Sequence, residues 1–134
     1  MPRAFFSIKY HADQSNRAHI ETILAALARA GFTATHIARD VEHWGALALP
    51  PRELMARTFA AIDACDLVVV DLAEKGVGVG IEAGYAHARK IPVVISAPRG
   101  ADVSTTLQGI ARQIFFYDEP SDLARFFVSE KIVA

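Results

Sequence analysis

A chain of 134 residues that is 52% hydrophobic is long and apolar enough for one continuous core, but short for two domains. Charged residues make up 22% of the chain and the formal net charge is -1, so no global field would gather nucleic acid or anionic lipid. We therefore expect one domain over residues 1–134, with no nucleic-acid or membrane partner.

The amino terminus does not resemble a signal peptide. Lys9 and His11 interrupt its short apolar stretch, and no small-residue cleavage site follows. Further along, no apolar run approaches the ~20 residues that cross a bilayer. The sequence therefore predicts a cytoplasmic protein.

The first half of the chain alternates between strand and helix. Residues 4–8 form a β-prone run, residues 16–30 carry apolar side chains at helical spacing, and residues 32–37 predict a second short strand. Residues 39–51 follow neither period and end in two prolines, which predicts a loop long enough to be functional. A helix is expected next, over residues 52–64.

The second half continues the alternation around a central strand. Residues 67–72 are almost continuously apolar, as in a strand that is buried on both faces of a parallel sheet. The remaining elements are expected to be a helix, a strand, a short helix, a strand and a helix, at residues 81–89, 91–96, near 107, 114–117 and 121–129. This order predicts an α/β fold, a doubly wound, flavodoxin-like or Rossmann-like parallel sheet of about five strands with helices on both faces.

A glycine-rich turn follows the central strand, where open parallel sheets bind their ligands. Gly76, Gly78 and Gly80 are expected to let the backbone bend sharply and to let main-chain N–H groups approach a sugar or phosphate. Glu82 is expected in the first turn of the next helix. A carboxylate there also stabilises a helix end, so its position alone leaves a structural and a ligand-facing role open.

The same turn formally matches a dinucleotide-binding fingerprint, from Gly78 through Gly80 to Ala83. That fingerprint should follow the first strand of its unit, and an acidic residue should end the next strand. Here the next strand ends in Ser96 and Ala97. We therefore expect no nicotinamide cofactor.

Several motifs between Asp66 and Gly109 resemble those of the nucleoside 2-deoxyribosyltransferase and nucleotide N-hydrolase superfamily. They are a strand that ends in an acid, the sequence G-V-G-x-G-x-E-x-G-Y-A, the sequence K-x-P-V-V, and a loop with Ser-Thr-Thr-Leu-x-Gly. The resemblance extends from about Phe5 to Phe127. It implies cleavage or transfer at the N-glycosidic bond of a nucleoside or nucleoside 5′-monophosphate, with Glu82 as the nucleophile. It also implies no metal, no cofactor and a homo-oligomer, a dimer or larger.

One position departs from this pattern. The resemblance implies an aspartate on the helix before the glycine turn, but a gapless alignment from Glu82 places Thr58 there, and threonine is no acid near neutral pH. Asp71, which ends the central strand, is the preferred substitute, although aspartates at strand ends often only order a loop. Asp40, which opens the irregular loop, is another candidate. The alternatives to an enzyme are a nucleotide-binding module that has lost the acid and a purely structural domain.

Other residues are expected to bind the substrate. By the resemblance, Ser104 binds the 5′-phosphate, often in a neighbouring subunit's site, and Ser7, Lys9 and Tyr10 at the first strand end contact sugar and phosphate. Ser104 is equally suited to cap the helix near residue 107, and a solvated lysine and a packed tyrosine are common alternatives. Trp44 in the irregular loop is expected to stack on the base or to anchor the core.

Overall fold

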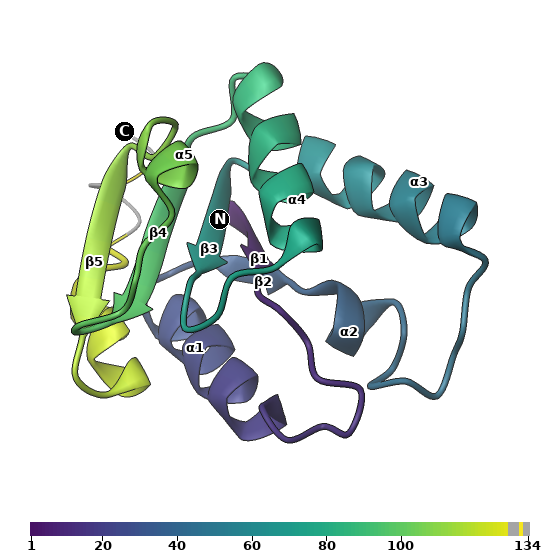
Figure 1. Ribbon diagram of the computed structural model, residues 1–134, viewed down its shortest axis with the longest axis horizontal. Helices are drawn as coiled ribbons and strands as arrows, with labels where there is room; N and C mark the ends of the chain where they lie inside the picture. The colour runs from purple at the N-terminus through teal and green to yellow at the C-terminus, as the bar shows by residue number, and fades with distance from the viewer. Residues whose placement is uncertain (129–131, 133–134) are drawn as a thin grey trace.

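The computed structural model describes residues 1–128 and 132. Five strands form one parallel sheet in the order β2-β1-β3-β4-β5 (Figure 1). The strands are β1 (Arg3–Ser7), β2 (Thr33–Thr35), β3 (Leu67–Asp71), β4 (Val93–Pro98) and β5 (Gln113–Tyr117). The strand order reverses direction between β1 and β3. In a doubly wound sheet the ligand crevice lies at this point, beyond the carboxyl ends of the two strands.

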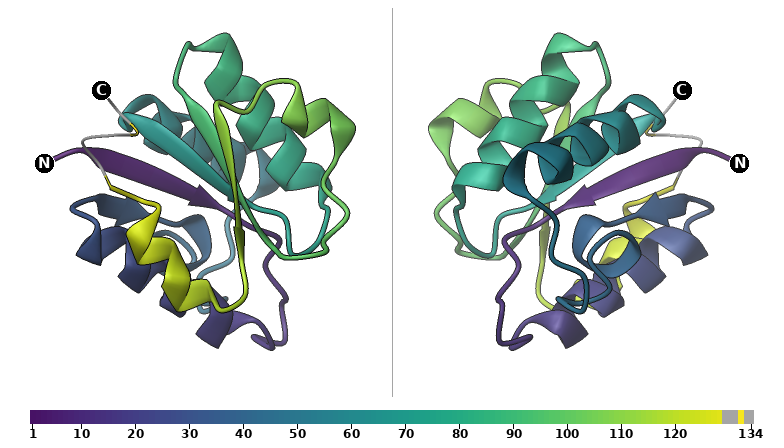
Figure 2. Two further views of the ribbon diagram at one scale, coloured as in Figure 1. Left: turned by 90° about the vertical axis from the view of Figure 1, so that its left-hand side faces the viewer. Right: turned by 90° about the vertical axis from the view of Figure 1, so that its right-hand side faces the viewer.

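Helices cover both faces of the sheet (Figure 2). The helix α1 and the 3₁₀ helix η1 pack on one face, while α3 and α4 pack on the other. The helical segments are α1 (Arg17–Arg29), α2 (Ile37–Asp40), α3 (Pro51–Asp63), α4 (Val77–Ala88), α5 (Thr105–Gln108) and η1 (Pro120–Arg125). This arrangement confirms the predicted doubly wound, flavodoxin-like sheet.

Side chains of the central strand alternate between two cores. Leu67 and Val69 join the core under α1, whereas Val68 and Val70 join the core under α4. A strand directs successive side chains to opposite faces of its sheet, so a shift of one residue moves a side chain from one core to the other. This alternation also decides which face each polar side chain at a strand end can reach.

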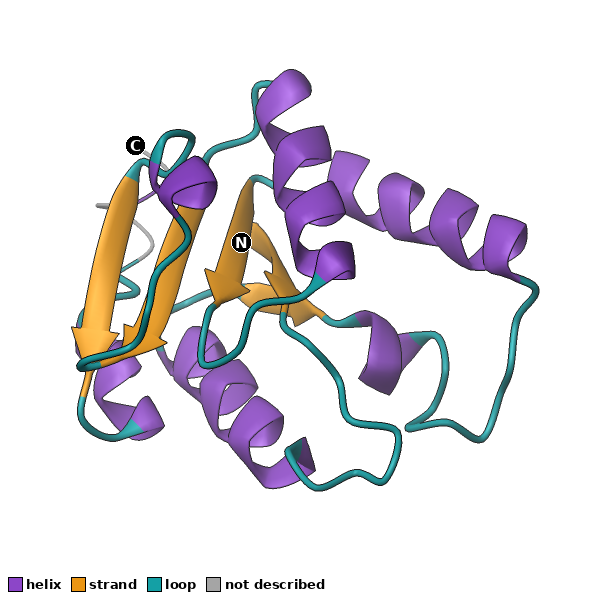
Figure 3. Cartoon of the chain, viewed as in Figure 1, coloured by secondary structure: helices purple, strands orange, loops and turns teal. Residues whose placement is uncertain are grey.

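Several predicted boundaries differ from the structure; the second strand, for example, was expected over residues 32–37 but is Thr33–Thr35, because α2 begins at Ile37. Helix α4 begins at Val77 rather than near residue 81, because glycine is a poor helix former and Gly78 and Gly80 obscured its first turn. The predicted loop over residues 39–51 begins with the end of α2 and then runs to α3 without regular structure (Figure 3). The last predicted helix is a 3₁₀ helix, and residue 129 of the predicted range lies outside the described residues.

Within residues 1–128 and 132, no helix combines the length and the apolar character that a bilayer span requires.

Candidate active site

Glu82 projects from the second turn of α4 toward the end of β1. The first turn of this helix carries no acidic residue, so stabilising the helix end does not explain Glu82. The Ser7 hydroxyl donates a hydrogen bond of 2.6 Å to Glu82 Oε1. Burial raises the pKa of Glu82 to about 7, although the Ser7 hydroxyl pulls it down. The carboxyl can therefore change its protonation near neutral pH, as reactive carboxyl groups in enzymes often do.

Two cavities meet at Glu82. One has a volume of about 210 Å³, and its polar lining comes from Tyr10, His36, Glu42 and Thr58. The other, of about 230 Å³, lies between the loop after β1 and the start of α4. Its lining includes Lys9, Tyr10, Gly76, Gly78 and Glu82. The structure thus brings six of the predicted site residues to the cavities that touch Glu82: Lys9, Tyr10, Thr58, Gly76, Gly78 and Glu82 itself.

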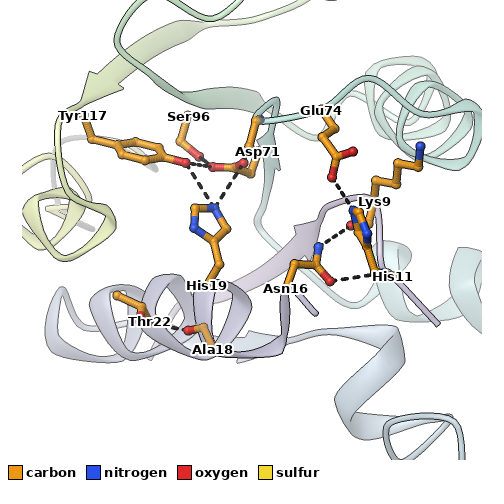
Figure 4. Close-up of polar contacts among 11 residues, drawn as sticks. Lys9, His11, Asn16, Ala18, His19, Thr22, Asp71, Glu74, Ser96 and Tyr117 are labelled. Carbon is orange, nitrogen blue, oxygen red and sulfur yellow. Dashed lines mark hydrogen bonds and ion pairs between the residues drawn. The ribbon is translucent and has the colours of Figure 1, made fainter. Parts of the chain in front are cut away.

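The loop after β1 is held in place by Asn16. The Asn16 side chain donates to the Lys9 carbonyl over 2.7 Å and accepts from the His11 backbone N–H over 3.0 Å. The His11 side chain in turn contacts the Glu74 carboxyl in the loop after β3 (Figure 4). These contacts join the two loops that flank the crevice and fix the backbone at Lys9.

The three glycines do not form the sharp bend that the sequence suggested. Gly76 is extended, and neither Gly78 nor Gly80 has a positive φ, so the expected sharp glycine bend is wrong. A Cβ added at Gly78 or Gly80 would meet nothing within 4 Å. Because Gly78 and Gly80 have no side chains, the faces of the first turn of α4 on which they lie stay uncovered, and the backbone N–H groups there are open to a ligand.

Ser104 lies on the other side of α4 from Glu82. Gly80, Gly84 and Ser104 line a separate cavity of about 420 Å³, whereas Gly78 and Glu82 point the opposite way around the helix. Ser104 caps α5, since its Oγ accepts from the backbone N–H of Leu107 over 3.5 Å. Within one chain, the structure does not bring Ser104 to Glu82.

Asp71 also lies away from Glu82, on the α1 face of the sheet. Its carboxyl is fully buried and accepts hydrogen bonds from Ser96 Oγ over 2.9 Å and from Tyr117 Oη over 2.8 Å. His19 Nε2 lies 3.6 Å from the same carboxyl (Figure 4). Burial and the nearby Asp71 raise the pKa of Tyr117. Asp71 lines neither cavity at Glu82, because the alternation along β3 sends it to the opposite face.

Asp40 and Trp44 do not line either cavity at Glu82, but both contact residues that do. The Asp40 carboxyl accepts from the His36 backbone N–H over 2.8 Å and pairs with Arg39. Burial opposes ionisation of Asp40, but these hydrogen bonds outweigh it and lower the pKa of Asp40. The Trp44 ring packs near Tyr10 and His36, at centroid distances of 5.9 and 6.1 Å. Trp44 therefore supports two residues that line the cavity.

Sequence reasoning missed His36 and Glu42. His36 Nδ1 lies 2.9 Å from the Phe6 carbonyl, which can only accept, so Nδ1 carries the proton and Nε2 is a bare acceptor. Burial lowers the pKa of His36 and keeps its ring neutral. Neither His36 Nε2 nor Tyr10 Oη has a hydrogen-bond partner among the described residues. The position of His36 just after β2, at the carboxyl edge of the sheet, is the signal that could have found it.

No three His, Cys, Asp or Glu side chains are grouped to hold a metal ion in the described part of the chain.

Comparisons with known proteins agree with the resemblance seen in the sequence. No model of a known protein family matches the chain. A protein of Thermofilum pendens (strain DSM 2475 / Hrk 5) named "Putative 2'-deoxynucleoside 5'-phosphate N-hydrolase 1" is 27% identical over 117 residues, which cover 84% of this chain and 81% of the relative.

Two solved structures share the fold at low sequence identity. The CMP N-glycosidase BcmB of Clostridium botulinum superposes with a TM-score of 0.69 at 16% identity, over 96% of this chain and 98% of that chain. A 2-deoxyribosyltransferase of Bacillus psychrosaccharolyticus gives a TM-score of 0.65 at 13% identity, over 91% of this chain and 90% of that chain. The named relative and the shared fold both match the superfamily that the sequence motifs indicated.

Proposed function

We propose that this chain, which resembles the nucleoside 2-deoxyribosyltransferase and nucleotide N-hydrolase superfamily in sequence and in fold, is an enzyme of the same kind. Its substrate is a nucleoside or a nucleoside 5′-monophosphate, and its reaction cleaves or transfers the N-glycosidic bond. Glu82 is the nucleophile. The proposed chemistry uses neither a metal nor a cofactor.

The environment of Glu82 is the observation that carries this proposal. A half-buried carboxyl at the junction of two cavities can lie beneath C1′ of a bound sugar, stabilise an oxocarbenium-like transition state and then form a glycosyl ester. The Ser7 hydroxyl orients the carboxyl and favours its ionised form. Water or a second base then releases the sugar.

The two cavities suit the two ends of such a substrate. Lys9 and the open first turn of α4 border the 230 Å³ cavity and offer a positive charge and free N–H groups, which suit a phosphate or the sugar hydroxyls. The 210 Å³ cavity has largely apolar walls with a few polar groups, which suits a nucleobase. We therefore place the base between β1 and α3, and the sugar above Glu82.

A homo-oligomer is part of the same proposal. Val77 is 84% exposed and Ile81 is 47% exposed on α4, beside the cavity that contains Ser104. A second copy packed on this face would cover the two apolar side chains and place its surface next to the first copy's Ser104. Ile81→Lys should then lower the mass measured by analytical ultracentrifugation, and an unchanged mass would remove this part of the proposal.

The direct test is release of free base. The purified protein is incubated with ribo- and deoxynucleosides and with their 5′-monophosphates, and free base is measured by chromatography. Glu82→Gln should abolish release, because the amide cannot act as the nucleophile. Glu53→Gln, which alters an exposed carboxylate paired with Arg57 on α3, is the matched control and should leave the rate unchanged. Activity that survives in Glu82→Gln would contradict the proposal.

The rival function is a nucleotide-binding module without turnover. Thr58 motivates it, because its hydroxyl lines the base cavity but donates to the Leu54 carbonyl over 2.8 Å and is no acid. Calorimetry that detects nucleotide binding, together with no release of base from any substrate, would favour this rival. A protein whose melting temperature responds to no nucleotide would favour a structural role instead.

A further inference from the structure

The proposed reaction lacks a proton donor. A nucleobase leaves slowly as an anion, so an enzyme of this kind needs an acid that protonates the base as the C–N bond breaks. Thr58 stands where the resemblance implies an aspartate. The donor must therefore be sought among the other polar groups that line the base cavity, namely Tyr10, His36 and Glu42.

Two of these three side chains are poorer proton donors than a carboxyl. The single N–H of the neutral His36 ring is already donated to the Phe6 carbonyl over 2.9 Å, and burial lowers the pKa of His36. A phenol is in general a weaker acid than a carboxylic acid, so a carboxyl in the same cavity is the better donor. His36 Nε2 and Tyr10 Oη instead remain free to hydrogen-bond the base.

The aspartates near the site are excluded on position. Asp71 lies on the opposite face of the sheet with its carboxyl bound by Ser96 and Tyr117. Asp40 is tied to Arg39 and to the backbone of His36, and hydrogen bonding holds its pKa low. Neither aspartate lines a cavity that touches Glu82.

Glu42 is the carboxyl that remains. It follows α2 at the start of the long loop to α3, and it lines the base cavity together with Glu82. Its carboxyl makes no hydrogen bond or ion pair with any residue of the described chain, so its proton and its lone pairs are free for a ligand. Burial raises the pKa of Glu42.

We propose that Glu42 is the general acid that protonates the leaving base, in place of the aspartate that Thr58 has replaced. This inference rests on the proposed function of Glu82. In the first step, Glu82 Oε attacks C1′, the C1′–N bond breaks with its electron pair going to the base nitrogen, and the Glu42 proton moves to that base. In the second step, water attacks C1′, the ester bond to Glu82 breaks, and the water proton returns to Glu42. The products are the free base and the sugar.

Substrate binding places the proton on the correct carboxyl. Glu42 and Glu82 line one cavity, so a bound substrate changes the surroundings of both carboxyls. A base that fills the cavity removes water from Glu42 and favours its neutral form. The positive charge that develops at C1′ favours the ionised form of Glu82, which the Ser7 hydroxyl already supports. Acid and nucleophile are thus assigned by the ligand itself.

The test compares leaving groups in wild type, Glu42→Gln, Glu42→Asp and Glu82→Gln. One substrate is a natural deoxynucleoside 5′-monophosphate. The other is the 4-nitrophenyl glycoside of 2-deoxyribose 5-phosphate, whose leaving group departs without a proton. Glu42→Gln should lower kcat about 100- to 10,000-fold on the natural substrate, with little change on the nitrophenyl substrate, and should remove the basic limb of the pH profile. Glu42→Asp should restore part of the loss.

The same measurements separate failure of this inference from failure of the proposed function. If Glu42→Gln slows both substrates equally, or slows neither, Glu42 is not the acid, while Glu82 can still be the nucleophile. If Glu82→Gln keeps its activity, or wild type cleaves no substrate, the proposed function fails and the role of Glu42 fails with it. Melting temperatures of all variants, with Glu53→Gln as the control, identify any loss that comes from misfolding.

Discussion

At the scale of single residues, the Ser7 hydroxyl favours the ionised form of Glu82 against the effect of burial. It donates over 2.6 Å to a carboxyl whose burial raises the pKa to about 7. In Ser7→Ala that donor is lost, so the pKa of Glu82 rises further. We expect the acidic limb of the kcat/KM profile to move to higher pH by about one unit, the usual worth of one hydrogen bond to a charged group.

A matched hydroxyl provides the control for this shift. Thr22 donates to the Ala18 carbonyl on α1 (Figure 4) and lines neither cavity at Glu82. Thr22→Ala should leave the pH profile in place. An unchanged profile in Ser7→Ala would show that the Ser7 hydroxyl does not govern ionisation of the nucleophile.

Burial of Glu82 should also cost stability above neutral pH. Its pKa of about 7 in the folded state lies above the ordinary glutamate pKa of 4.5, so between these two pH values the folded chain keeps a proton that the unfolded chain has lost. Stability therefore falls as pH rises through this window and is level above it. Glu82→Gln escapes the penalty, and we expect it to be more stable than wild type by about 1–3 kcal/mol at pH 8.

The pH dependence of the stability gain in Glu82→Gln decides whether ionisation is its cause. Urea unfolding at pH 4 and at pH 8 should show the stabilisation of Glu82→Gln only at the higher pH. A gain of equal size at both values would mean that packing, rather than ionisation, explains the variant.

The sequence could indicate a site residue where a motif contained it, but not where the position of the residue depends on the folded path of the chain. The motif singled out both Glu82 and Thr58, and the two residues line one cavity. The face that Asp71 occupies depends on the strand alternation and on which helices cover each face, which no single motif encodes. Glu42 lies in an irregular loop, and its nearness to Glu82 follows only from the folded path of that loop.

At the scale of elements, the two glycines in the first turn of α4 lower the stability of the helix but leave its backbone accessible to a ligand. Gly78 and Gly80 lie inside a helix where an added Cβ meets nothing within 4 Å. Gly78→Ala and Gly80→Ala should each stabilise the fold by about 0.5–1 kcal/mol, as alanine does for glycine in helices. Thermal or urea unfolding measures this gain.

The two variants should differ in activity. Gly78 lines both cavities at Glu82, whereas Gly80 lines the cavity on the far side of the helix. A methyl group at position 78 should raise KM, while Gly80→Ala should leave KM close to that of wild type. Equal effects at both positions would contradict the assignment of the substrate to the Glu82 side of α4.

Most elements were predictable because their periodicity is strong. The apolar run of β3 and the helical spacing of α1 are each confirmed within one or two residues. The start of α4 was not predictable, since glycine has weak helix propensity and the helix is completed by packing on the sheet. The short helix α2 lacks the length to show a period.

At the scale of the whole molecule, Asp71 joins elements that are distant in sequence. Its carboxyl at the end of β3 is bound by Ser96 of β4 and Tyr117 of β5, with His19 of α1 close by. Tyr117→Phe removes one donor from a fully buried carboxyl, so we expect a loss of about 1–3 kcal/mol in the free energy of unfolding.

A half-buried tyrosine on the opposite face is the control. Tyr85 donates to Asp63 over 2.8 Å near the surface, and Tyr85→Phe should cost less in stability. Because Asp71 lies on the other face from Glu82, Tyr117→Phe should leave the pH profile of activity unchanged. A shifted profile would return Asp71 to the catalytic role that the sequence suggested.

The half-buried carboxyl of Glu82 has a consequence for inhibitor design. A side chain that water cannot easily solvate gains most from a fixed positive charge placed beside it, and it gains little from a neutral sugar of the same shape. An iminosugar, which carries a protonated nitrogen near the anomeric position, should therefore raise the melting temperature more than its uncharged carbocyclic analogue. If the two compounds stabilise the protein equally, the carboxyl lies too far from the sugar to sense its charge.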